Sequence, residues 1–455
     1  MRPPYFHAIA LACLLLLCPA LQAQSLETDV LSTLIAPPAA APVSDAAPPQ
    51  PAPAADPAIE TTLIPLVDQE PPTPPPAVID LTVSPDNLWQ RIRNGFAMPD
   101  LNSPLVANRQ AWYLNHPDSL NRIVRRSGKY LYYIVEEIEQ RGMPTELALL
   151  PMMESAFNPL AHSRARALGM WQFIPSTGKN YKLEQNFWRD ERRDVIASTK
   201  AALDYLQSIY EMHGDWHLAL ASYNWGENAV RRAIAKNETQ GLPTDYENLS
   251  MPKETQYYVP SLQALKNIIA QPEVFGFDLA PLSNQPYFDT VALPHNMDVA
   301  VAAKLAEMPV DEFIALNPAY HRPLIRGDST TQLVLPTGKV DVFQNNLQRY
   351  KAQDKPLTYW RTYALKKGET LDKVAARHNI STVKLKQLNS ISPKTKIQPG
   401  FTLLVPDPGA QVSDQLAESL PKIPAEGRKA TKQGKKKAPV RGKPKSKPTG
   451  QPVKR

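Results

Sequence analysis

The 455-residue sequence predicts a mainly α-helical domain, followed by two small α+β modules and flanked by disordered segments. In the first half of the chain, apolar residues recur at the three- and four-residue spacing of amphipathic helices. A β-α-α-β pattern then occurs twice. The 47 prolines cluster largely outside these regions, so they mark linkers rather than domains. We therefore expect six segments: residues 1–23, 24–84, 85–280, 286–337, 358–407 and 408–455.

Residues 1–23 predict an export signal that is removed from the mature chain. Arg2 supplies a positive charge, an apolar run covers residues 8–17, and Ala23 is a small residue suited to cleavage. The run is shorter than the roughly 20 apolar residues of a membrane span, so we expect no transmembrane helix in the mature chain. An alternative is a lipid anchor at Cys18, although the three leucines before it are not the small residues usual at such sites.

The two segments outside the folded regions differ in charge. Residues 24–84 hold 14 prolines, eight acidic residues and no basic residue, which predicts an extended tether or spacer. Residues 428–455 hold 12 Lys or Arg and no acidic residue. The whole chain carries +7, so the chain without this tail carries −5. The basicity therefore belongs to the tail. We expect the tail to solubilise the chain or to bind an anionic polymer or lipid surface, and export argues against nucleic acid as a partner.

Helices are expected throughout residues 85–280. Residues 131–138 have apolar side chains at helical spacing. Glu136, Glu137 and Glu139 are expected on the solvated face of this helix. After the turn that follows, Thr145 is expected to cap the next helix. A further helix is expected over residues 195–212, closed by a glycine.

Glu154 stands at the end of a run that is apolar or proline from residue 147 to 153. A helix that is apolar on all sides is buried. A carboxyl group against an apolar wall has its charged form disfavoured, so its pKa rises. Such a group stays protonated near neutral pH and can act as a general acid. The alternative for a single glutamate at a helix end is a structural cap or ion pair.

Three later segments suit contact with sugar rings: the first two combine glycine, amide and aromatic residues, and the third combines an amide with two tyrosines. They are residues 169–173, 221–226 and 254–260. Each segment alone is a weak signal, because aromatic residues at such spacing usually belong to a core. Together with Glu154, and in this order, they are specific.

The four segments resemble the signature of the soluble lytic transglycosylase family, whose fold is similar to goose-type lysozyme. The family pattern runs Glu-Ser, Gly-Leu-Met-Gln, Ala-Tyr-Asn-Ala-Gly and a Tyr-Val segment. This chain departs from it at Met170-Trp171, Ser222 and Trp225. These departures concern subsite preference more than catalysis. The resemblance implies a lysozyme-like catalytic domain.

The resemblance also implies a role for each matching residue. Glu154 matches the catalytic glutamate, and Tyr223 matches a tyrosine held against its carboxyl group. The other matches are expected to contact the substrate: Ser163, Gly169, Met170, Gln172, Asn224 and Tyr258.

In that family one glutamate does the work that two carboxyl groups do in ordinary glycosidases. It protonates the oxygen between N-acetylmuramic acid and N-acetylglucosamine, and then deprotonates the C6 hydroxyl, which closes a 1,6-anhydro ring without water. Two alternatives stay open: a lysozyme-type hydrolase of the same fold and a non-catalytic wall-binding scaffold. Asp190, Glu191 and Asp194 are candidates for a second carboxyl group, but their arginine-rich setting predicts surface ion pairs.

Residues 286–337 and 358–407 repeat one β-α-α-β unit, with Asn317 and Asn389 at matching positions. The second copy resembles the LysM module, which binds glycans that contain N-acetylglucosamine. The first copy has Asp298 and its neighbours in place of the Gly-Glu-Thr loop, so it is expected to be degenerate, with or without sugar affinity. In the second copy the resemblance implies a glycan-binding groove at Gly368, Thr370, Leu371 and Asn389.

No metal-binding, nucleotide-binding or redox motif stands out in the sequence, so no cofactor is expected. The expected partner is the glycan strand of peptidoglycan. An exported enzyme of this kind is expected in the periplasm, free or attached to the outer membrane.

Overall fold

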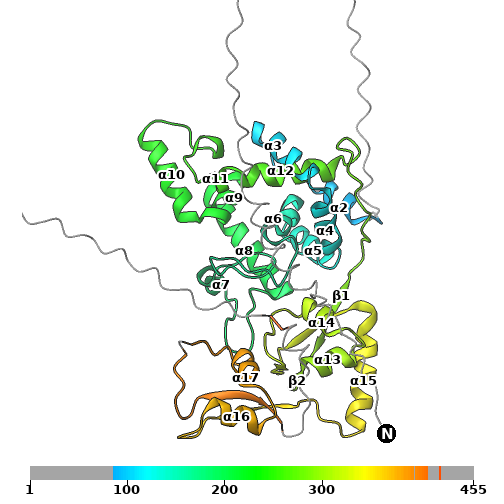
Figure 1. Ribbon diagram of the computed structural model, residues 1–455. Coiled ribbons are helices and arrows are strands. Elements are labelled where there is room, and N and C mark those ends of the chain that lie inside the picture. Colours follow the sequence, from blue (N-terminus) through cyan, green and yellow to red (C-terminus); the bar gives the residue numbers. More distant parts are fainter. Residues whose placement is uncertain (1–85, 394, 408–419, 422–455) are drawn as a thin grey trace, which may run out of the picture.

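The computed structural model describes residues 86–393, 395–407 and 420–421, and Figure 1 shows a helical domain above two smaller α+β modules. The fold class predicted from the sequence is confirmed. The predicted export signal, the proline-rich segment up to residue 84 and the basic tail lie outside the described residues. Within the described residues, no helix is long and apolar enough to cross a membrane.

The first domain consists of short and medium helices around one apolar core. In chain order they are α2 (Leu88–Asn94), α3 (Pro104–Leu114), α4 (Pro117–Ser127), α5 (Leu131–Glu139), the 3₁₀ helix η1 (Thr145–Leu149), α6 (Leu150–Ser155), α7 (Pro175–Asn180), α8 (Val195–His213), α9 (Trp216–Trp225), α10 (Glu227–Thr239), the 3₁₀ helix η2 (Tyr246–Asn248), α11 (Lys253–Gln256) and α12 (Tyr258–Ala270).

Helix α8 shows how local chemistry sets these boundaries. The Asp194 carboxylate accepts hydrogen bonds from the backbone N–H of Ile196 and of Ala197, which satisfies two free donors of the first turn. Gly214 ends the helix in the left-handed conformation, at φ +64°. The helix therefore runs as the sequence predicts, and its apolar face packs against α9 and α5.

Two local predictions are wrong. The Thr145 hydroxyl does not cap a helix; it donates to the carbonyl oxygen of Ile92 at 2.6 Å, and the chain continues as the 3₁₀ helix η1. Glu137 is buried rather than solvated, because Arg141 pairs with it at 2.5 Å and the Tyr133 hydroxyl donates to it at 2.9 Å. A bond to a distant helix decided the first case, whereas partners one helical turn away on either side of Glu137 decided the second.

The two modules share one plan. In the first, β1 (Phe288–Ala292) pairs antiparallel with β4 (Gln332–Pro336), and a short pair forms between β2 (Met297–Asp298) and β3 (Leu324–Ile325). In the second, β5 (Trp360–Ala364) pairs antiparallel with β6 (Thr402–Pro406). The helices between these strands are α13 (Val299–Leu305) and α14 (Val310–Leu316) in the first, and α16 (Leu371–Arg377) and α17 (Thr382–Leu388) in the second. A short 3₁₀ turn, η3 (Thr337–Lys339), leads into α15 (Val340–Ala352). The sequence analysis did not predict this helix, which follows the first module along the chain and packs against α13 and β1.

Asn389 is a structural residue of the second module, which corrects its predicted place in the glycan groove. Its amide group donates to the carbonyl oxygens of Leu385 and Leu404, both at 2.9 Å, and its oxygen accepts from the N–H of Leu404 at 2.7 Å. The side chain is only 4% exposed. Asn317 makes the same three bonds to Phe313 and Val334 in the first module. The repeated asparagine thus joins a helix end to the closing strand.

The modules also contact the helical domain. The N–H of Asp190 donates to the carbonyl oxygen of Ala319 at 3.0 Å, and the Arg322 guanidinium lies 4.0 Å from the Phe187 ring centroid. Arg322 also donates to the Ser390 hydroxyl at 3.0 Å. One buried arginine of the first module therefore contacts the helical domain and the second module.

Replacing Asn389 by alanine is expected to destabilise the second module by about 2–3 kcal/mol, because the buried N–H of Leu404 would lose its partner. Lys386→Ala, an exposed change on the same helix, is the matched control and should stay within about 0.5 kcal/mol. Urea unfolding followed by tryptophan fluorescence measures both. Equal stability of the two variants would contradict the structural role.

Candidate active site

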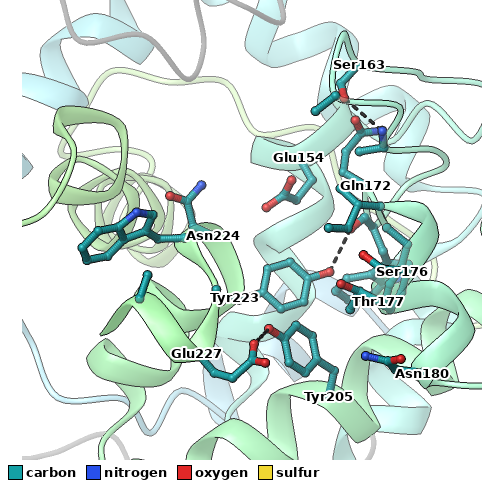
Figure 2. A pocket seen from close by; sticks show the side chains of 18 of the residues that line it. Glu154, Ser163, Gln172, Ser176, Thr177, Asn180, Tyr205, Tyr223, Asn224 and Glu227 are labelled. Carbon is teal, nitrogen blue, oxygen red and sulfur yellow. Dashed lines mark hydrogen bonds between the residues drawn. The ribbon is translucent and has the colours of Figure 1, made fainter. Parts of the chain in front are cut away.

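Glu154 lines a pocket of about 980 Å³ in the helical domain (Figure 2). The pocket is built from segments that are far apart in the sequence: the end of α6, the loops around α7, and the helices α8 to α11. Residues in its wall include Ser163, Arg164, Gln172, Phe173, Asn180, Tyr205, Tyr223, Asn224, Trp225, Glu227, Arg232 and Glu254. The side chains therefore offer carboxylate, amide, hydroxyl, guanidinium and aromatic groups.

The position of Glu154 follows from the buried helix that carries it. All residues from 147 to 153 are buried, as the apolar run predicts. After Ser155 the chain turns sharply, since Ala156 and Phe157 both have positive φ angles, of 52° and 53°. Such angles are uncommon for residues other than glycine, and the buried Phe157 side chain holds the turn in place. Glu154 thus stands at the last turn of a rigid helix, facing the pocket.

The surroundings of Glu154 favour its protonated form. Burial raises the pKa of Glu154 to about 7, the Tyr258 hydroxyl lowers it by donating a hydrogen bond to Oε1 at 2.5 Å, and the nearby Glu254 carboxylate raises it. Burial and the adjoining Glu154 in turn raise the pKa of Tyr258 well above its ordinary value. The tyrosine therefore remains a hydrogen-bond donor, and Glu154 exchanges a proton near neutral pH.

The contact expected of Tyr223 is made by Tyr258. The Tyr223 hydroxyl donates instead to the backbone carbonyl oxygen of Trp171 at 2.8 Å (Figure 2). Tyr223 still lines the pocket. Burial and the neighbouring Glu154 raise its pKa. Its hydrogen bond therefore ties α9 to the backbone at Trp171.

Three of the predicted substrate contacts lie in the pocket wall: Ser163, Gln172 and Asn224. Gln172 donates through Nε2 to the carbonyl oxygen of Gly169 at 2.7 Å, and the Asn224 amide oxygen accepts from the Thr255 hydroxyl at 2.8 Å. The Ser163 hydroxyl accepts from the N–H of Ala167 at 3.1 Å. Figure 2 shows Asn224 and Gln172 on opposite sides of Glu154.

Gly169 and Met170 do not line the pocket, contrary to their prediction. Gly169 has φ +80°, and a Cβ at this position would lie 2.0 Å from the carbonyl oxygen of Arg192. The glycine is therefore required for close backbone packing. Met170 is 1% exposed and belongs to the core.

The pocket contains two further carboxylates that the sequence analysis did not identify, Glu227 and Glu254. Glu227 directly follows the segment 221–226, and Glu254 is the first residue of the segment 254–260. Their closeness to these two motifs is the sequence feature that could have identified them as pocket residues. The three candidates proposed instead form local structure. Asp190 pairs with Arg192 at 2.7 Å, Glu191 pairs with Arg189 at 3.2 Å, and Asp194 caps α8.

In the second module, the predicted groove residues differ in exposure. Gly368 is exposed with φ +79°, whereas Leu371 is buried. The Thr370 hydroxyl caps α16 by accepting from the N–H of Lys373 at 3.3 Å. Hydrogen bonds from the Tyr363 hydroxyl and the backbone N–H of Lys366 lower the pKa of Glu369 to about 2, and its carboxylate pairs with Arg377 at 2.8 Å.

The corresponding loop of the first module is covered by the chain itself. Asp298 is buried in β2, and its carboxylate accepts from the backbone N–H of Tyr359 at 2.8 Å. Its own N–H donates to the carbonyl oxygen of Leu357 at 2.9 Å. The linker to the second module therefore covers this loop.

No group of three or more His, Cys, Asp or Glu residues in the described part of the chain is arranged to hold a metal ion.

Three family models match successive parts of this chain: "Transglycosylase SLT domain" at residues 132–243, "Lytic transglycosylase MltD, LysM-like domain" at 287–352, and "LysM domain" at 363–406. The chain is also 34% identical over 335 residues to membrane-bound lytic murein transglycosylase D of Escherichia coli (strain K12), covering 71% of this chain and 74% of that protein. The chain belongs to the lytic murein transglycosylase D family.

Other relatives match a shorter part of the chain at lower identity. Membrane-bound lytic murein transglycosylase C of Glaesserella parasuis serovar 5 is 25% identical over 167 residues, which covers 34% of this chain and 42% of that protein. The prediction of a lytic transglycosylase with LysM modules is confirmed. The match of the family's LysM-like domain extends through α15, the helix that the β-α-α-β pattern did not include.

Replacing Glu154 by glutamine is expected to stabilise the protein above pH 7, by about 1–3 kcal/mol. A pKa raised from 4.5 to about 7 means that the folded state resists ionisation of Glu154, at about 1.4 kcal/mol for each pKa unit. Contact with pocket water reduces this penalty. Below pH 4 the residue is protonated in both states, so the difference should vanish; it should grow between pH 4.5 and 7.

Urea unfolding of both proteins at pH 4, 6 and 8 measures this difference. A stability difference that does not depend on pH would contradict the raised pKa of Glu154.

Proposed function

We propose that Glu154 acts as acid and then as base in cleaving the β-1,4 bond between N-acetylmuramic acid and N-acetylglucosamine. The observation that carries the proposal is a carboxyl group with a pKa of about 7, in a pocket of about 980 Å³ lined by amides and aromatic rings. A general acid works best when its pKa lies near the operating pH. Glu154 meets this condition because burial outweighs the hydrogen bond from Tyr258.

In the first step the protonated Glu154 donates its proton to the bridging oxygen, and the bond from that oxygen to C1 of the muramic acid breaks. The leaving chain keeps the oxygen as a hydroxyl group. The positive charge that develops at C1 is stabilised by the muramic acid N-acetyl group. Glu154 is left as a carboxylate, and the Tyr258 hydroxyl stabilises it.

In the second step the Glu154 carboxylate removes the proton of the C6 hydroxyl, and O6 attacks C1. The product is a 1,6-anhydro-N-acetylmuramic acid end, and Glu154 is protonated again. No water is consumed. The attacking hydroxyl belongs to the same sugar, so little entropy is lost in positioning it.

Three residues of the pocket wall are proposed to bind the glycan on either side of the cleaved bond: Ser163, Gln172 and Asn224. Their hydrogen bonds to neighbouring groups fix the orientation of each side chain before substrate binds. Trp225 offers a ring face at the same site. Tyr223 and Tyr258 support the site, Tyr223 through the backbone of Trp171 and Tyr258 through Glu154.

The second LysM module is proposed to hold the enzyme on glycan through the exposed loop at Gly368 and Thr370. The first module is proposed to be structural, because its loop carries the linker. The related protein of Escherichia coli is named a membrane-bound murein enzyme. We therefore propose that this chain is exported to the cell envelope and acts in the periplasm, free or attached to the outer membrane.

Mass spectrometry of products from purified peptidoglycan tests the reaction. Native protein should release muropeptides with 1,6-anhydro ends. Glu154→Gln should reduce their formation by about 10²- to 10⁴-fold, as expected when an essential acid is removed. Products heavier by one water would identify a hydrolase, and Glu254, which is close enough to influence Glu154, would then be the candidate base. Glycan binding without products from the native protein would identify a scaffold.

The pH dependence of kcat/KM tests the role of Tyr258. Activity of the native protein should fall as the pH rises through about 7, because the first step requires protonated Glu154. Tyr258→Phe removes a hydrogen bond that favours the carboxylate, so the fall should move to higher pH. Tyr257→Phe, the adjacent half-buried tyrosine, is the control and should leave the profile in place. A shift to lower pH in Tyr258→Phe would refute the assignment.

A further inference from the structure

A second carboxylate, Glu227, stands in the same pocket as Glu154 but in a different setting (Figure 2). It is the first residue of α10 and half-buried. The Tyr205 hydroxyl donates to its Oε2 at 2.8 Å. Burial and the Glu227 carboxylate raise the pKa of Tyr205, so this hydroxyl stays protonated and fixes the position of Glu227. The carboxylate that raises the pKa of Glu154 is a different one, that of Glu254.

Glu227 has no basic partner in the part of the chain that the structure describes: the ion pairs formed there involve other carboxylates. Its neutral neighbours supply one hydrogen bond from Tyr205 and a longer one, of 3.3 Å, from the Asn228 amide. A carboxylate can accept about four hydrogen bonds. Glu227 therefore has acceptor capacity left, inside a pocket where a ligand group would displace water.

A cationic ligand group matches this site best. Metal binding is disfavoured, because the described residues provide no cluster of three potential ligands here. The wall also carries Arg232, five residues further along α10. A ligand that carries both an amine and a carboxylate would therefore find an opposite charge for each. Peptidoglycan contains such a group, because the peptide stem on muramic acid includes a diamino acid.

We propose that Glu227 is a specificity residue that binds the free amine of a peptide stem. The proposal rests on the proposed function, since it takes peptidoglycan as the substrate of this pocket. Stems in which the amine is blocked, by cross-linking or by acetylation, lose the positive charge and would be bound less well. The enzyme would thus prefer strands whose stems carry a free amine.

The test compares two substrates that differ only at the amine: soluble glycan strands with free stem amines, and the same strands after chemical N-acetylation. For the native protein, kcat/KM should be about fivefold higher with the free amine, the effect of one partly exposed ion pair. In Glu227→Gln, which keeps the shape and can still accept from Tyr205, the ratio should fall to about one. Glu238→Gln, an exposed change on the same helix, should keep the native ratio.

A native ratio near one, or a ratio that Glu227→Gln leaves unchanged, would overturn the proposal. The same ratio is measured in binding, as Kd for the two substrates in a Glu154→Gln background with and without Glu227→Gln. This readout does not depend on turnover. Whether the products have 1,6-anhydro or reducing ends tests the proposed reaction separately. The preference for free-amine strands can be measured with either kind of product.

Discussion

The structure of the site depends on one constraint, the burial of an ionisable carboxyl group at the end of an apolar helix. Keeping Glu154 uncharged requires an apolar wall, which the buried residues 147–153 of η1 and α6 supply. Keeping it ready to ionise requires a donor, and Tyr258 supplies that from a helix 104 residues further along the chain. The left-handed residues Ala156 and Phe157 then turn the backbone away, so that the carboxyl group meets the pocket rather than the core.

The loop before α8, which contains Asp190 and Arg192, supports the pocket wall and contacts the first module. Arg192, paired with Asp190, donates to the carbonyl oxygens of Arg166 and Phe173, which flank the loop that carries Gln172. The backbone of Asp190 contacts Ala319 in the first module. These contacts therefore connect the wall of the pocket with the first module. The first module is thus attached close to the loop that carries Gln172.

The two modules share the hydrogen bonds that hold their fold but differ in the loop before the first helix. Asn317 and Asn389 make the same bonds in both copies, because each copy must join its second helix to its closing strand. The loops have diverged around this common frame. In the first copy Asp298 holds the linker, whereas in the second Gly368 remains exposed. The asparagine shared by both copies thus belongs to the fold, whereas the loops around it differ in exposure.

The sequence by itself determined the fold class, the helix predicted over residues 195–212, the repeat and the place of Glu154 at the end of a buried run, because periodicity, caps and apolar runs act over a few residues. Tertiary structure decided which tyrosine bonds Glu154, which carboxylates join it, and that Gly169, Met170 and Asn389 serve packing. These outcomes depend on groups distant in sequence meeting across a pocket or a core. Spacing along the chain identifies candidate residues, but only the packing of helices and strands shows which polar atoms find partners and which remain available to a substrate.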